Sequence, residues 1–319
     1  MNRMSKYKEF DNANLKKYNV ADRKSKVNID EFAKVGDVSA SSFLDCIPNI
    51  LKGKDIKELI EITYRAYKNK KNIIIGIGGH VIKTGMSPLF IEMMKLGAIQ
   101  GVCCNGSVTI HDFEISCFGQ TSENVALALE DGSFGMAADT CDTINKIIEK
   151  GAIEGLGYGE AIGKYLSETD ILHPELSLLK NAYEMNVPVT VHIALGTDIV
   201  HQHETAIGAA IGECSMRDFK IFTNLVSELG DGGVFISFGS AVIIPEVFLK
   251  ALTVCRNKGY AVQNFTTAAF DMNYHYRPDA NIVSRPVKSG GKGFYFIGHH
   301  EIMIPLFLLA LREKIKGAT

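Results

Sequence analysis

Short apolar runs that end in glycine or small polar residues recur along the chain, and longer amphipathic segments separate them. The first run, Ile73 to Ile77, leads into Gly78, Gly79 and His80. A strand that is buried on both faces of a parallel sheet carries apolar residues at almost every position, so such a run predicts a parallel strand. By the same criterion, further strands are expected at residues 98–104, 187–193, 233–238, 260–265 and 294–297.

The segments between these runs have the marks of helices. Ser87 and Pro88 are typical of a helix start, and Gly97 can end that helix in the left-handed conformation. Gly151 is expected to stop a helix that begins at Asp139. Other helices are expected at residues 56–70, 160–167 and 175–184.

The spacing of Ser215 and Asp218 resembles a capping box, which predicts that a helix starts there and ends at Gly230. Together, the alternating strands and helices predict an α/β fold with a doubly wound, mostly parallel sheet and helices on both faces. Ligands in such folds bind outside the carboxyl ends of the strands.

The composition fits one large domain. The chain has 319 residues, of which 46% are hydrophobic and 22% are charged, as in many globular α/β proteins. Residues 1–28 are rich in Lys and Arg, and we interpret them as a basic, solvated N-terminal extension. Residues 29–319 are expected to form a single domain.

Charge and cysteine content argue against several classes of function. The net charge of −2 provides no strong attraction to nucleic acid or to an anionic membrane. Seven scattered cysteines indicate a reducing compartment rather than a disulfide framework. The polar N-terminus does not resemble a signal peptide, and the most apolar segments are too short to span a bilayer. We therefore expect a soluble, cytoplasmic protein without nucleic-acid or membrane partners.

Eight of the nine histidines lie at or near the ends of predicted strands, namely His80, His111, His192, His201, His203, His275, His299 and His300. Two kinds of site could use them. In the first, His201, His203 and Glu204 bind a divalent metal together with His111 and Asp112, because two histidines two apart on an extended segment point the same way. In the second, glycines and small residues after each strand bind a dinucleotide, and the histidines and acids handle the substrate.

Several motifs together resemble those of one family. Gly79-His-Val-Ile-Lys-Thr-Gly85 follows the first strand, and Cys104-Asn-Gly-Ser-Val108 follows the second. Ala194-Leu-Gly-Thr-Asp198, Gly239-Ser-Ala-Val242, and Phe265-Thr-Thr-Ala-Ala-Phe-Asp271 with Arg277-Pro-Asp279 come next, in the same order. In order and spacing the chain resembles the deoxyhypusine synthase family over residues 73–309. The resemblance implies the family's Rossmann-like fold and NAD as the cofactor.

By position, the resemblance implies cofactor contacts for Gly79, His80, Asn105, Gly106, Asp198, Ser240, Thr266, Thr267, Asp271, His299 and His300. The substrate side departs from the family pattern, because Thr109 and Ile110 stand where the family has paired glutamates. Substrate contacts are implied for Asp112, Glu114, His203, Asn273 and His275. Lys288 lies nearest to the register of the family's nucleophilic lysine, and Glu246 or His111 is the expected general base.

The implied function is an NAD-dependent aminoalkyl transfer on an amine or polyamine, similar to that of deoxyhypusine synthases or homospermidine synthases. In the family's chemistry NAD takes a hydride from the carbon of a C–N bond, an amine attacks the resulting imine, and the hydride returns. The acceptor is a lysine, in this chain or in a protein substrate, or a free amine. The family is generally homotetrameric, which implies a homo-oligomer here.

Two alternatives stay open at this point. One is a metal-dependent hydrolase of a guanidino or amide compound, which would use the histidines as ligands. The other is a catalytically silent, NAD-binding regulatory protein.

Overall fold

The computed structural model describes residues 43–317. Contacts divide the chain into residues 1–53 and 54–319, and the described part of the first unit contains α1 (Phe43–Cys46) and the start of α2 (Leu51–Lys68). The basic extension expected at residues 1–28 lies outside the described residues, so it stays a prediction. Within residues 43–317, no helix is long and apolar enough to cross a membrane.

Six parallel strands form one sheet in the order β3-β2-β1-β4-β5-β6. The strands are β1 (Ile73–Ile77), β2 (Gly101–Asn105), β3 (Val189–His192), β4 (Val234–Phe238), β5 (Phe265–Asp271) and β6 (Gly291–Ile297). The strands β1, β2 and β3 are added one after another toward one edge of the sheet. The chain then crosses to β4, on the other side of β1, and β5 and β6 extend the sheet toward the opposite edge, so the direction of strand addition reverses between β1 and β4. The carboxyl ends are level there, because Ile77 pairs with both Cys104 and Phe238.

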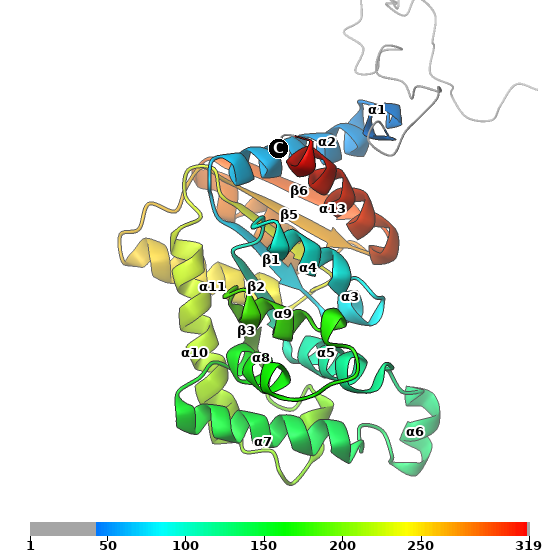
Figure 1. Cartoon of the computed structure of the whole chain (residues 1–319). Coiled ribbons are helices and arrows are strands. Elements are labelled where there is room, and N and C mark those ends of the chain that lie inside the picture. Colours follow the sequence, from blue (N-terminus) through cyan, green and yellow to red (C-terminus); the bar gives the residue numbers. More distant parts are fainter. Residues whose placement is uncertain (1–42, 318–319) are drawn as a thin grey trace, which may run out of the picture. The chain divides into compact units, whose positions relative to one another are not determined.

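Helices cover both faces of this sheet (Figure 1). Phe235 of β4 stacks on Phe248 of α11 (Ile243–Asn257), with ring centroids 4.0 Å apart. On the other face, Phe238 contacts Phe90 of α4 (Ser87–Lys95) at 5.8 Å and Phe307 of α13 (His300–Lys316) at 6.3 Å. Residues 235 and 238 point to opposite faces because side chains alternate along a strand. The predicted α/β fold with helices on both faces is therefore confirmed.

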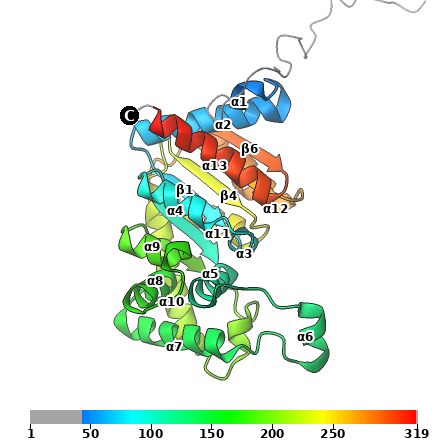
Figure 2. The ribbon, with the colours of Figure 1, turned by 45° about the vertical axis from the view of Figure 1, so that its right-hand side comes forward.

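The remaining helices and short helical turns are α3 (Gly79–Lys83), α5 (Gly106–Phe118), α6 (Val125–Asp131), α7 (Ala138–Glu154), α8 (Tyr158–Glu168), η3 (Pro174–Leu176), α9 (Leu178–Glu184), η4 (Ile199–Gln202), α10 (Gly208–Ser227), α12 (Tyr276–Pro278), η5 (Asp279–Ser284) and η6 (Pro286–Ser289). Figure 2 shows α5, α7, α8 and α9 grouped together, with α6 projecting to one side, and all five belong to the long connection between β2 and β3.

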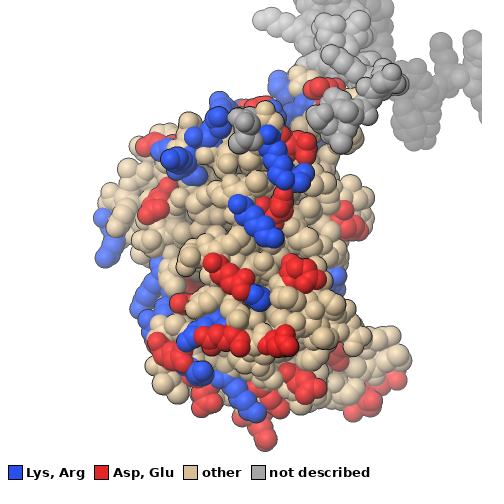
Figure 3. Space-filling model, in the orientation of Figure 1, with Lys and Arg blue, Asp and Glu red and all other residues tan. Residues whose placement is uncertain are grey.

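Positive and negative side chains lie next to each other on the face shown in Figure 3. Arg312 and Lys316 of α13 pair with Glu92 of α4 at 3.0 and 2.8 Å, and Lys314 pairs with Glu61 of α2. These partly exposed pairs each contribute little to stability. They do show that the basic residues of α13 serve helix packing.

Side chains from α10 satisfy the free edge of β3. Ser215 Oγ accepts from Ile193 N at 3.0 Å and donates to Val191 O at 3.0 Å. Asp218 accepts from Val191 N at 2.7 Å and from Gly159 N, in α8, at 3.0 Å. The expected helix start at Ser215 is therefore wrong: α10 begins at Gly208, and both polar side chains bond to the neighbouring strand instead of capping α10.

Two other expectations also need correction. Gly151 lies inside α7, which ends at Glu154; a Cβ at Gly151 would lie 2.6 Å from Ala161 Cβ, so this glycine permits close packing of α7 and α8. The expected strand at residues 260–265 is wrong as well, because β5 begins only at Phe265. Asn264, with φ of +56°, adopts a left-handed turn conformation just before it.

Candidate functional site

The turns after β1 and β4 meet where the strand order reverses. Gly78 N donates to Phe238 O at 2.9 Å, and a Cβ at Gly78 would lie 2.0 Å from Gly239 O. Gly239 has φ of +64°, a conformation that favours glycine. The close approach therefore requires glycine at Gly78, and the two turns present main chain rather than side chains at the reversal point.

His80 and His300 lie beside these turns. His300 is the first residue of α13 and only 1% exposed, and a Cβ at Gly239 would lie 2.7 Å from its Nε2. Its ring centroid is 5.8 Å from that of His80. Burial lowers the pKa of His300, so its ring is uncharged at neutral pH. Its Nδ1 is buried without a hydrogen-bond partner among the described residues.

His111, on α5, approaches the same turn from the other side. A Cβ at Gly79 would lie 3.2 Å from His111 Cδ2. His111 Nδ1 lies 2.8 Å from Thr121 Oγ1, and burial lowers the pKa of the ring. The carboxyl end of the sheet thus holds two uncharged imidazoles, His111 and His300, which could accept a proton at neutral pH.

Asp198 lies in the loop after β3, against the start of α5. A Cβ at Gly106, the first residue of α5, would lie 2.1 Å from Asp198 Oδ2, and burial raises the pKa of this carboxyl to about 6. His201 Nδ1 accepts the N–H groups of Gly196 and Asp198, both at 3.2 Å. Its Nε2 therefore carries the ring proton, and it is buried without a partner among the described residues.

Asp271 is the last residue of β5 and is 7% exposed. Its Oδ1 accepts from Met272 N at 2.8 Å and lies 3.6 Å from His275 Nε2. Tyr295 holds the loop that follows Asp271. Its hydroxyl accepts from His275 N at 2.9 Å and donates to Asn273 O at 3.1 Å. This loop brings His275 and Asn273 to the end of β5.

Most predicted cofactor residues come together at the carboxyl end of the sheet. They are the last residues of strands, or lie in the turns after the strands or in the first turns of the following helices: Gly79, His80, Asn105, Gly106, Asp198, Ser240, Asp271, His299 and His300. Some also support the local fold. Ser240 Oγ accepts from Ile244 N at 3.2 Å, and Asn105 Oδ1 accepts from Ser107 Oγ at 3.1 Å.

Thr266, Thr267 and Lys288 lie at the opposite end of the sheet. Thr266 pairs with Val234, the first residue of β4, and Thr267 Oγ1 donates to Ile282 O at 2.7 Å. Lys288 is exposed in η6, which precedes β6. The seven residues of β6 span roughly 20 Å at about 3.3 Å per residue. The structure does not bring these three residues to the other predicted cofactor contacts.

Two predicted substrate residues on α5 are engaged within the fold. Asp112 is buried and accepts from Ser177 Oγ at 2.7 Å and Leu178 N at 2.6 Å, which holds the start of α9. Burial raises its pKa to about 6. Glu114 accepts from Thr121 Oγ1 at 2.5 Å and Thr140 Oγ1 at 3.1 Å.

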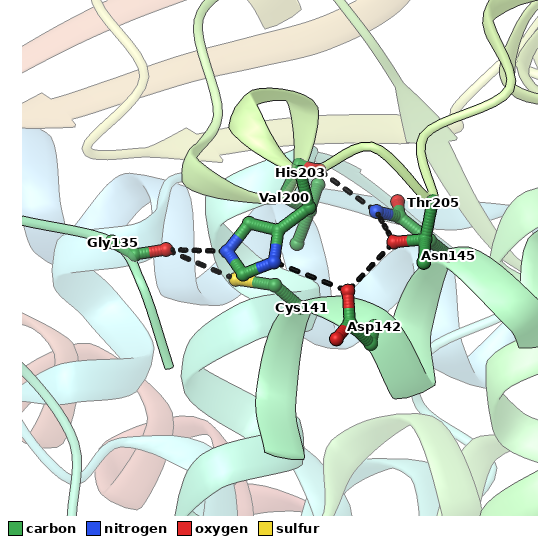
Figure 4. A network of polar contacts seen from close by, with 7 residues as sticks. All are labelled: Gly135, Cys141, Asp142, Asn145, Val200, His203 and Thr205. Carbon is green, nitrogen blue, oxygen red and sulfur yellow. Dashed lines mark hydrogen bonds and ion pairs between the residues drawn. The ribbon is translucent and has the colours of Figure 1, made fainter. Parts of the chain in front are cut away.

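His203 lies in a separate polar network (Figure 4). Its Nδ1 is 3.1 Å from Asp142 Oδ1, and its Nε2 is 2.8 Å from Gly135 O. Thr205 donates to the same Asp142 oxygen at 2.8 Å, and Asn145 Nδ2 donates to Thr205 Oγ1 at 3.0 Å. The network fixes the segment after η4 to α7.

The histidines therefore do not converge on a metal. His201 points its Nδ1 at backbone N–H groups, whereas His203 bonds to α7 and to the segment before it. Within residues 43–317, no group of three or more His, Cys, Asp or Glu side chains could hold a metal ion. The geometry gives no support to the hydrolase alternative.

Glu246, the other predicted base, occupies the first turn of α11. It pairs with Lys250, lies 3.4 Å from Arg277 Nε, and accepts from Asn281 Nδ2 at 3.0 Å. The hydrogen bond from Lys250 is the main reason that its pKa is lowered. An ionised carboxylate with these partners is a weak base, so His111 is the better candidate.

Two cavities lie away from this region. One, of about 580 Å³, is lined by Tyr183, Pro188 and Asp218 near the start of β3. The other, of about 520 Å³, is lined by Lys68, Lys70 and their neighbours near the starts of β1 and β2. Lysines after a helix C-terminus also offset the helix dipole. Neither cavity is lined by a histidine or by the turns after β1 and β4, so we place the candidate site at the carboxyl end.

No protein-family model matches the sequence, and no curated protein matches it. Several solved structures share the fold. AgrE without ligand gives a TM-score of 0.54 at 12% identity, covering 88% of this chain and 34% of that chain. AgrE in a ternary complex with ornithine and NAD+ gives 0.53 at 12% identity, covering 83% and 33%.

The match to a proposed deoxyhypusine synthase from Entamoeba histolytica has a TM-score of 0.50 at 10% identity, covering 86% of this chain and 93% of that chain. ArgZ, an arginine dihydrolase from the ornithine–ammonia cycle in cyanobacteria, gives 0.50 at 12% identity, and this chain spans 33% of its length. At such identities the likeness shows the fold alone. The chain has an α/β, Rossmann-like fold that it shares with a proposed deoxyhypusine synthase and with AgrE, which was solved in complex with ornithine and NAD+.

Proposed function

We propose that the chain binds NAD at the carboxyl end of the sheet and uses it on a small molecule that carries an amine. The observation that carries this proposal is the strand reversal between β1 and β4, with the glycine turns at Gly78 and Gly239 and the histidines beside them. In sheets with this strand order, dinucleotides bind across the crevice at the reversal point.

The residues present fit such a ligand. Buried polar atoms usually have partners, yet His300 Nδ1 and His201 Nε2 have none among the described residues. His201 Nε2 carries a proton, so it could donate to a ligand oxygen. Asp198, in the loop after β3, and Asp271, at the end of β5, could accept hydrogen bonds from ribose hydroxyls or from a cationic amine.

The chemistry would be shared between cofactor and protein. NAD, when bound, supplies a hydride acceptor for the carbon next to the amine nitrogen. Asp271 is our candidate for accepting a hydrogen bond from a ribose hydroxyl of NAD. His111 would take the amine proton, because its uncharged ring lies beside the glycine turn.

A covalent intermediate on Lys288 is implied by the family resemblance alone, and this proposal does not include it because Lys288 lies at the opposite end of the sheet. The identity of the acceptor, a lysine or a free amine, also rests on that resemblance. The similarity to AgrE, which was solved with ornithine and NAD+, is a similarity of fold. It agrees with an amine-bearing substrate but does not identify one.

Titration calorimetry with NAD tests the proposal. We expect saturable binding to the wild-type protein and weaker binding to His80→Ala, whose side chain lies at the reversal point. His173→Ala is the matched control, because His173 lies before η3 and pairs only weakly with Glu175, at 3.9 Å. Absence of binding to the wild type, or equal loss in both variants, would contradict the proposal.

Turnover separates an enzyme from a silent NAD-binding protein. We expect the protein, with NAD and isotopically labelled diamines or amino acids, to convert at least one amine to a new product. Binding of NAD without conversion of any amine in the panel would favour the regulatory alternative.

A further inference from the structure

Three side chains form a hydrogen-bonded chain at the end of α5. Thr121 Oγ1 lies 2.5 Å from Glu114 Oε2 and 2.8 Å from His111 Nδ1. A hydroxyl has one hydrogen to donate, whereas a carboxylate can only accept. Thr121 therefore donates to Glu114 and accepts from His111, so the proton of the neutral imidazole resides on Nδ1.

The local fold explains why these residues meet. His111 and Glu114 are three positions apart on α5, so they lie on the same face of the helix. The helix ends at Gly119, whose φ of +71° turns the chain back. This reversal places Thr121 between the two side chains, although it lies outside the helix.

Glu114 is held from a second side as well. Its Oε1 accepts from Thr140 Oγ1, in the first turn of α7, at 3.1 Å. Both carboxylate oxygens thus have hydroxyl donors from separate segments, which fixes the group that orients Thr121. Asp142, the partner of His203 in Figure 4, lies two residues further along α7.

The other ring nitrogen, Nε2, adjoins the ring atom that approaches the turn after β1. A Cβ at Gly79 would lie 3.2 Å from His111 Cδ2, which is bonded to Nε2. No hydrogen bond joins this Nε2 to another of the described residues. With the proton on Nδ1, Nε2 carries the lone pair.

We propose that Thr121 and Glu114 are positioning residues that hold His111 in the Nδ1–H tautomer and leave Nε2 as a proton acceptor at the carboxyl end of the sheet. A base whose tautomer is set by a hydrogen bond to its other nitrogen recurs in acid–base catalysis. The use of this base on an amine rests on the proposed function, whereas the tautomer does not.

The test is nitrogen-15 NMR of protein labelled at histidine, in which the two ring nitrogens distinguish the tautomers. His111→Gln identifies the resonances of His111. At a pH where the ring is neutral, we expect a protonated Nδ1 and an unprotonated Nε2 in the wild type. An Nε2–H signal from His111 in the wild type would overturn the proposal.

Matched variants separate positioning from mere packing. In Thr121→Val the acceptor for Nδ1–H is lost with little change of shape, so we expect the Nε2–H tautomer to appear. Thr121→Ser restores the hydroxyl and should restore the wild-type spectrum. Thr205→Val removes a hydroxyl from the His203 network and should leave His111 unchanged. A wild-type tautomer in Thr121→Val would overturn the proposal, even if that variant were less stable.

The charge of Glu114 has a separate signature. In Glu114→Gln the amide oxygen can still accept from Thr121, so the tautomer should persist. The negative charge that raises the pKa of His111 is gone, so the pKa should fall further below 6.5. An unchanged or higher pKa, in a variant that melts like the wild type, would exclude Glu114 as a partner of the imidazole.

The two proposals can fail independently. An Nδ1–H tautomer in a protein that does not bind NAD would leave His111 as an oriented base and refute only the cofactor. NAD binding together with a tautomer that ignores Thr121→Val would refute only the positioning role.

Discussion

Asp218 provides a quantitative test of how α10 holds β3 in place, because its carboxyl group bonds to the main chain of β3 and of α8. This carboxylate is 1% exposed and holds two buried N–H groups, Val191 N at 2.7 Å and Gly159 N at 3.0 Å. Replacement by alanine leaves both donors unsatisfied. At about 1–3 kcal/mol for each buried group, we expect Asp218→Ala to lower the free energy of unfolding by about 2–6 kcal/mol.

The same residue predicts a pH dependence. Burial is the main cause that raises the pKa of Asp218 from 3.8 to about 7. Between about pH 4 and pH 7 the folded protein therefore retains a proton that the unfolded chain has lost, so this group's contribution to stability falls as pH rises. A difference of about 3 pH units corresponds to at most about 4 kcal/mol.

Urea unfolding of the wild type and Asp218→Asn, measured from pH 4 to pH 7.5, isolates this contribution. Asparagine does not titrate, whereas Asp112 and Asp198 titrate in both proteins. We expect the wild type to lose about 1–4 kcal/mol relative to Asp218→Asn as pH rises through this window. A constant difference, or a wild type that gains relative stability, would mean that the carboxylate stays ionised in the fold and would refute the reasoning.

Three further results are expected. Asp271→Ala should weaken NAD binding by about 1–3 kcal/mol in calorimetry, as for a lost hydrogen bond to a charged group. The control Asp279→Ala should bind NAD like the wild type, and equal NAD affinities of Asp271→Ala and the wild type would remove Asp271 from the site. Lys288→Ala should leave NAD affinity unchanged, and borohydride added with NAD and labelled putrescine should trap no adduct on Lys288; a mapped adduct there would restore the covalent lysine route. Light scattering should report a homo-oligomer, with a tetramer as the expected form from the family resemblance, and a monomer throughout the micromolar range would count against that resemblance.

Much of the fold could be predicted because its strongest signals are local. Ile73 to Ile77 is apolar at almost every position since both faces of β1 are covered, and Gly97, with φ of +68°, follows α4 as expected. The helix start predicted from Ser215 and Asp218 was wrong for the opposite reason. Their spacing imitates a local helix cap, but their partner Val191 lies 24 and 27 residues away.

The candidate site was only partly accessible to sequence reasoning. The glycines and histidines after the strands were visible because parallel strands place their carboxyl ends at the same end of the sheet. The resemblance also assigned Thr266 and Lys288 to the site, although they precede the greater part of β5 and β6. Thr121 carries no motif of its own, because its role depends on the reversal at Gly119.

A crystal structure of the complex with NAD tests the central claim most directly. We predict NAD across the carboxyl ends of β1 and β4, with Asp198 or Asp271 within hydrogen-bond distance of a ribose hydroxyl and His111 and His300 beside the nicotinamide. NAD bound at the cavity near Tyr183 and Pro188, or no bound NAD in crystals grown at saturating concentration, would contradict the account.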